Sequence, residues 1–137
     1  MRRRRPQPLL FLAFVVIMGA LMFANDLPVT NSNVGLKTAA GRLKVYYQET
    51  PPPMDWAIAA IAPRAGEVWV DLTLPDVLAA AFLHTPRKKL LEALKSQCPP
   101  KADKAWSVLL ETQDIEVRGL SPEGKALAAI SCRAALN

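Results

Sequence analysis

Apolar residues first gather in an uninterrupted run, Leu9–Ala24, which contains sixteen residues and no charged side chain. Four arginines, Arg2, Arg3, Arg4 and Arg5, stand shortly before it. At about 1.5 Å of rise per residue the run covers roughly 24 Å as a helix, and flanking residues extend it toward the ~30 Å of a hydrocarbon core. Each Leu, Ile, Val or Phe adds roughly 0.3–0.6 kcal/mol in favour of insertion. The pattern therefore predicts a transmembrane helix over residues 9–27.

This run has two other interpretations. A soluble core helix of this length would keep a polar face, which the run lacks. A cleaved signal peptide also begins with basic residues and an apolar stretch, but it ends in a small-x-small site. Cleavage after Ala20 or Ala24 would place Met18 or Met22 at the −3 position. These bulky residues favour an uncleaved signal anchor, and a secreted protein that has lost its leader is the alternative.

The arginines also predict an orientation in the lipid bilayer. Lys and Arg near a membrane helix are retained on the cytoplasmic side, and none follows the run before Lys37. We therefore expect residues 1–8 to form a cytoplasmic basic tail and the rest of the chain to lie outside the cytoplasm. The abundance of alanine and proline suggests a bacterial protein. The predicted location is a bacterial inner membrane, with the C-terminal domain in the periplasm.

The segment that follows the apolar run predicts a linker and a first strand. Residues 28–41 contain polar residues and glycine without a sustained apolar period, which is typical of a linker. Leu43, Val45 and Tyr47 alternate with polar or less apolar side chains, and this alternation predicts a strand at residues 42–49.

The next two segments predict different elements. Residues 54–63 are rich in alanine and begin with a possible N-cap, Asp55, so we expect a short helix there. Ala65 and Gly66 then turn the chain. Glu67–Leu74 alternates strictly between apolar and polar side chains, which predicts a strand with one packed face.

The last third of the chain predicts helices and then a hairpin. Helical segments are expected at residues 76–83, 86–97 and 103–110, and two strands at residues 115–120 and 126–133. Strands followed by helices and strands predict an α+β fold. We expect one periplasmic domain over residues 42–137, with an antiparallel or mixed sheet and helices packed on it.

Charge excludes one class of partner. The formal net charge is +5, but without the four N-terminal arginines the other 13 Lys and Arg nearly balance the 12 Asp and Glu. A near-neutral domain lacks the charge that phosphate-backbone binding requires, so no nucleic-acid partner is expected.

The two cysteines, Cys98 and Cys132, both fall on the expected periplasmic side. An even pair within one small domain in an oxidising compartment is more often a disulfide than a metal site. We therefore predict a Cys98–Cys132 disulfide.

The sequence contains no recognisable catalytic, cofactor-binding or metal-binding motif. His84 is the single histidine, and a catalytic histidine needs a nucleophile and an orienting group. Three Cys or His residues spread over residues 84–132 are poor zinc ligands, and no phosphate-binding glycine motif occurs. We expect no enzyme activity and no cofactor.

Two features suggest binding to another protein. Trp69 lies on the polar face of its predicted strand, where an exposed Trp would serve as an anchor for a partner; the alternative is a core Trp covered by a helix. Gly19, Ala20 and Ala24 would allow another membrane helix to approach closely.

These features lead to two hypotheses of function. The first is a single-pass, non-enzymatic accessory, stabilising or assembly subunit of a larger integral membrane protein complex. The second is a membrane-tethered periplasmic ligand-binding or sensing module, which would need a pocket beside Trp69 and Tyr46.

Overall fold

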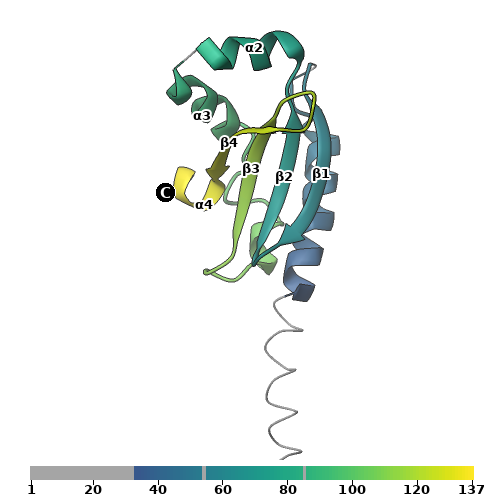
Figure 1. The fold of residues 1–137 in the computed structure, drawn as a ribbon. Helices are drawn as coiled ribbons and strands as arrows, with labels where there is room; N and C mark the ends of the chain where they lie inside the picture. The colour runs from purple at the N-terminus through teal and green to yellow at the C-terminus, as the bar shows by residue number, and fades with distance from the viewer. Residues whose placement is uncertain (1–32, 54, 85) are drawn as a thin grey trace, which may run out of the picture. The chain divides into compact units, whose positions relative to one another are not determined.

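Four strands form one mixed sheet in the order β1-β2-β3-β4 (Figure 1). The strands are β1 (Ala57–Arg64), β2 (Glu67–Thr73), β3 (Asp114–Leu120) and β4 (Ala126–Ser131). The outer pairs β1–β2 and β3–β4 are antiparallel, and the central pair β2–β3 is parallel. This computed structural model describes residues 33–53, 55–84 and 86–137. The predicted α+β class with a mixed sheet and packed helices is confirmed.

β2 shows the alternation that the sequence predicted. Val68, Val70 and Leu72 are fully buried, while Trp69 on the opposite face is half-buried. The chain enters β2 through a two-residue turn in which Ala65 and Gly66 both have positive φ, 47° and 80°. Two positive φ angles are the signature of a hairpin turn that matches the twist of the flanking strands.

The prediction of a short helix at residues 54–63 is wrong, because most of this segment is strand β1. Ile58 and Ile61 are three residues apart, which suggests helical spacing. The register shifts between Ile58 and Ala60, so Ala59 is an extra residue in the strand. This bulge places both isoleucines on the same face, opposite Leu72 and Val70, although two residues separate them.

The prediction of a strand at residues 42–49 is also wrong, because residues 33–49 form a helix. The helix also takes in residues 33–41, which we expected to be irregular. Its buried side chains repeat with helical spacing: Leu36, Ala39, Ala40, Leu43 and Tyr47. Val45, an inward residue in the predicted strand, is 50% exposed. Alanines contribute little hydrophobic contrast, so the apolar stripe is weak in the sequence pattern. Their small side chains let the helix pack closely on the sheet core.

One glycine allows a close approach of this helix to a neighbouring segment. A Cβ at Gly35 would lie 2.6 Å from the carbonyl oxygen of Val108. Tyr47 fixes the other end of the helix, where its hydroxyl donates to the carbonyl of Gln97 at 2.6 Å. Both contacts join the helix to the segments between β2 and β3.

Helices make the crossover between the parallel strands β2 and β3. They are α2 (Asp76–His84), α3 (Arg87–Lys95) and one 3-10 turn, η1 (Trp106–Val108). The first two confirm the predicted helices. The third was expected over residues 103–110: Asp103 accepts a hydrogen bond from the Ala105 amide like a cap, but the helix ends after one turn. Leu110, at the end of the predicted helix, is 56% exposed.

The predicted disulfide joins the end of this crossover to the end of the sheet. Cys98 follows α3, and Cys132 begins the short helix α4 (Cys132–Ala135), which replaces the last two residues of the strand expected at 126–133. The two sulfur atoms are bonded, with a Cα–Cα distance of 5.5 Å. The bond therefore holds the C-terminal end of α3 against the end of β4.

The predicted membrane helix at residues 9–27 lies outside the described residues. Across residues 33–137, as far as they are described, no helix has the length and apolar character that crossing a bilayer requires.

Candidate functional site

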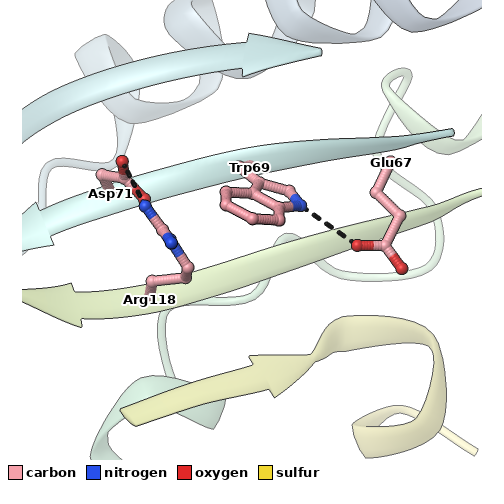
Figure 2. A network of polar contacts seen from close by, with 4 residues as sticks. All are labelled: Glu67, Trp69, Asp71 and Arg118. Atoms are coloured by element: carbon pink, nitrogen blue, oxygen red, sulfur yellow. Dashed lines mark hydrogen bonds and ion pairs between the residues drawn. The ribbon is translucent and has the colours of Figure 1, made fainter. Parts of the chain in front are cut away.

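A network of charged side chains around a tryptophan lies on the sheet surface opposite the hydrophobic core. We call this surface the Trp69 face; it consists of Glu67, Trp69 and Asp71 of β2 with Glu116 and Arg118 of β3. The parallel register sets Asp71 beside Arg118 and Trp69 beside Glu116. Figure 2 shows four of these residues along the two central strands.

Asp71 and Arg118 form a two-pronged ion pair across the parallel strands. Arg118 Nε donates to Asp71 Oδ1 at 2.7 Å, and Nη2 donates to Oδ2 at 2.9 Å (Figure 2). This fork geometry makes strong, directional hydrogen bonds. The pairing with Asp71 raises the pKa of Arg118 further above its ordinary value, against the opposing effect of burial. The guanidinium is thereby fixed in one orientation.

Two arginines contact the indole ring of Trp69. The guanidinium of Arg118 is 4.1 Å from the centre of the indole ring, and that of Arg64, at the end of β1, is 5.1 Å away. A cation over a Trp ring is attracted by the negative face of the ring. The indole Nε1 donates to Glu67 Oε2 at 3.1 Å. Trp69 is therefore neither a free-standing anchor nor a core residue, but a half-buried side chain that its neighbours hold in place.

Glu67 and Glu116 bring two carboxyl groups together at one end of this face. Burial raises the pKa of Glu116, and its hydrogen bond to Glu67 and the negative charge of Glu67 raise it further. The positive charge of Arg118 acts in the opposite direction, and Asp114 adds to the increase. A carboxyl group in this position keeps its proton to a higher pH than an exposed glutamate does.

Alanines flank the central strands on the Trp69 face. Ala60 and Ala62 of β1 lie beside Asp71 and Trp69, and Ala129 of β4 lies beside Arg118. These side chains are short, whereas the central strands between them carry the indole of Trp69 and the guanidinium of Arg118. Trp and Arg are the residues most often found at the energetic centres of protein–protein interfaces.

Tyr46 does not line a pocket with Trp69, which is the arrangement that the second hypothesis would need. It lines a separate groove of about 520 Å³ between the helix at residues 33–49 and the loop at residues 102–104. Partial burial and the nearby charge of Asp103 raise the pKa of Tyr46. The other lining residues combine small, apolar and charged side chains: Thr38, Gly41, Arg42, Val45, Glu49, Ala102, Asp103 and Lys104.

The other predicted residues are spread over the molecule. Cys98 and Cys132 are brought together as a disulfide. His84 is exposed at the end of α2. Arg2–Arg5, Gly19, Ala20 and Ala24 lie outside the described residues, so the orientation and helix-packing predictions stay predictions. Within the described part of the chain, no three His, Cys, Asp or Glu side chains are placed to hold a metal ion.

Three residues of this site were not identified from the sequence: Arg64, Glu116 and Arg118. The sequence held part of the signal, since Glu116 and Arg118 are two residues apart on a predicted strand and must share a face. Their placement beside Trp69 depends on the parallel pairing of β2 with β3, and no local pattern indicates that pairing.

Comparisons with known proteins show a likeness of fold. No family model matches the sequence, and no curated protein matches it. Among solved structures, the chain is similar to the pilotin EpsS from the type 2 secretion system of Vibrio vulnificus. The TM-score is 0.52, with 14% sequence identity, over 79% of this chain and 96% of that one. The α+β fold described above is therefore also found in a pilotin.

Proposed function

We propose that this protein is a non-enzymatic accessory subunit that binds and helps to assemble a larger complex, of the kind found in bacterial secretion systems. The observation that carries the proposal is the fold shared with a secretion-system pilotin over 96% of that protein's length. The proposed docking surface is the Trp69 face.

The chemistry of the Trp69 face supports this role. Trp69, Arg64 and Arg118 provide an apolar ring and two cations on one surface. The ion pair with Asp71 fixes Arg118 before any partner arrives. A partner therefore meets a surface that is already ordered, and binding loses less side-chain entropy.

Residues 9–27 would anchor the subunit in the inner membrane, with Arg2–Arg5 in the cytoplasm and the α+β domain in the periplasm. The apolar run and its basic flank support this placement. Gly19, Ala20 and Ala24 would then contact a helix of the partner complex. Intact mass of the mature chain tests the anchor: the full length is expected, and loss of about the first 24 residues, as signal-peptide cleavage produces, would contradict it.

Co-purification tests the proposed role. The full chain is extracted from its native membranes in mild detergent, and the proteins that accompany it are identified. We expect a defined set of larger membrane proteins with the native chain and a loss of about thirtyfold in affinity for the Trp69→Ala variant, as for an interface hot spot. Val77→Ala is the matched control, because Val77 is 80% exposed on α2. Equal recovery with both variants would exclude the Trp69 face.

A membrane-tethered ligand-binding module is the second candidate, and the groove beside Tyr46 favours it. Replacing Gly41 with Leu would fill this groove, since a Cβ at Gly41 meets no atom within 4 Å. If the groove holds a ligand, Gly41→Leu abolishes binding of that ligand, while Trp69→Ala leaves it unchanged. The opposite result supports the accessory subunit.

A further inference from the structure

β1 lies at an edge of the sheet, where a bulge at Ala59 and Pro63 interrupt it but no charged side chain protects Ala57–Ala62. Within the described part of the chain, β2 is its one neighbour in the sheet. Residues Ala57–Ala62 carry no charge, and Ile58 is 40% exposed. Unpaired N–H and C=O groups on an edge can bind another strand, so natural proteins usually place charges there. The lack of charge makes this edge a candidate pairing surface.

The first six residues of β1, Ala57–Ala62, have a sequence that is symmetric about its midpoint. The order Ala-Ile-Ala at residues 57–59 is repeated at residues 60–62, and Asp55 and Arg64 carry opposite charges at equal distances from the midpoint. Such a segment is complementary to itself when it runs antiparallel to an identical segment. A two-fold axis produces this arrangement in homodimers.

We propose that β1 pairs antiparallel with β1 of a second copy of this chain, in the register that sets Ile58 of one copy opposite Ile61 of the other. The same register sets Ala57 opposite Ala62 and Asp55 opposite Arg64. The two four-stranded sheets would then form one continuous sheet. This inference is independent of the proposed function.

The direction of the side chains selects this register. Ile58 and Ile61 lie beside Leu72 and Val70, so both point to the core face of the sheet. Ala57 and Ala62 lie beside Thr73 and Trp69, so both point to the opposite face. Opposite residues of an antiparallel pair point to the same face, and the proposed register satisfies this for both pairs. A shift of one residue would place Ile58 opposite Ala60 or Ala62, which face the other way.

The bulge in β1 fits the same symmetry. The proposed two-fold axis passes between Ala59 and Ala60, where the register of β1 against β2 shifts. The bend of one strand is therefore met by the same bend in the second copy. Pro63, which lacks an N–H to donate, lies outside the six central residues.

The pairing would be weak in dilute solution. Six residues on each side is a small contact beside the roughly 20–30 residues of a standard interface. We therefore expect a dimer that forms in a concentration-dependent way. Attachment of both copies to one membrane would favour it by raising their effective concentration.

Paired cysteines test the register in the full chain, in detergent and in membranes. Ala57→Cys with Ala62→Cys is expected to give an interchain disulfide under mild oxidation, identified by mass spectrometry. Neither substitution alone would do so, because each residue then lies about 16 Å along the strand from its copy. The two single variants are therefore the matched controls. Equal cross-linking of either single variant, or none of the 57/62 variant, would overturn the proposal.

A charge exchange provides a second test that does not depend on cysteine chemistry. Asp55→Arg and Arg64→Asp each create two like-charge pairs per dimer, so each is expected to raise the dimer dissociation constant about tenfold. The double variant restores the opposite charges and is expected to recover the native value, as measured by analytical ultracentrifugation. If the double variant dimerises no better than the single ones, the pairing is wrong. If the native chain stays monomeric at every concentration, it is likewise wrong.

Discussion

Ala65 occupies a backbone conformation that a residue with a Cβ rarely adopts. Its φ is 47°, and among the described residues no other non-glycine residue has a positive φ. The left-handed region costs an L-residue other than glycine roughly 1 kcal/mol. We expect Ala65→Gly to raise the free energy of unfolding by up to about 1 kcal/mol, less the entropy that glycine gains in the unfolded chain. Gly66→Ala should lower it. Urea unfolding measures both, and a destabilised Ala65→Gly would contradict the turn geometry.

Tyr47 couples stability to alkaline pH. Its buried phenol donates to Gln97, and burial, aided by Tyr46 and Asp103, raises its pKa well above the ordinary 10.0. Above pH 10 the unfolded chain loses this proton before the folded one does, so stability falls as pH rises. Tyr47→Phe is expected to cost about 1 kcal/mol at pH 7 through the lost hydrogen bond and to flatten the alkaline decline. Tyr46→Phe, at a less buried phenol, should flatten it less.

Glu116 couples stability to pH in the acid range. Its pKa is raised above 4.5 in the folded protein, so its favourable contribution is complete below pH 4.5 and is lost as pH rises through the folded pKa. Glu116→Gln is therefore expected to be more stable than the native protein at pH 7, with the difference closing toward pH 4. Glu123→Gln, in the exposed turn before β4, is the control. An equal gain in the free energy of unfolding at pH 7 and pH 4 would show that the Glu67–Glu116 contact does not cause the stabilisation of Glu116→Gln.

The disulfide links two secondary-structure elements, because it joins the end of α3 to the end of β4. Its cysteines are 34 residues apart. Closing a loop of this length stabilises the fold by about 3–4 kcal/mol through the entropy of the unfolded chain. Replacing Cys98 and Cys132 by alanine should lower the free energy of unfolding by about this amount. A loss below about 1 kcal/mol would indicate that the reduced chain retains structure in this loop.

How far the sequence predicts the elements depends on whether their periodicity is local and uninterrupted. β2 was predicted because its valines and leucine alternate without a break. β1 was missed because the bulge at Ala59 gives Ile58 and Ile61 a helical spacing. The helix at residues 33–49 was missed because alanines form much of its buried stripe. A bulge and a stripe of small residues both remove the apolar contrast on which periodicity depends.

The candidate site was predictable only in part, for the residues that belong to a single strand. Trp69, Glu67 and Asp71 share a strand face in sequence and in structure. Arg118, the residue that orders this face, comes from a strand 47 residues away through a parallel pairing. Parallel pairing is set by how the crossover helices pack, which no short segment of sequence encodes.

For the whole molecule, the decisive measurement is the size of the native assembly that contains this chain. Membranes are solubilised in mild detergent, and the chain is followed by size-exclusion chromatography for the native form, Trp69→Ala and Val77→Ala. We predict that the native chain and Val77→Ala elute with a complex much larger than a dimer of 15.0 kDa chains, and that Trp69→Ala shifts to the free form. Elution of the native chain as a free monomer or dimer under every gentle condition would contradict the role as an accessory subunit.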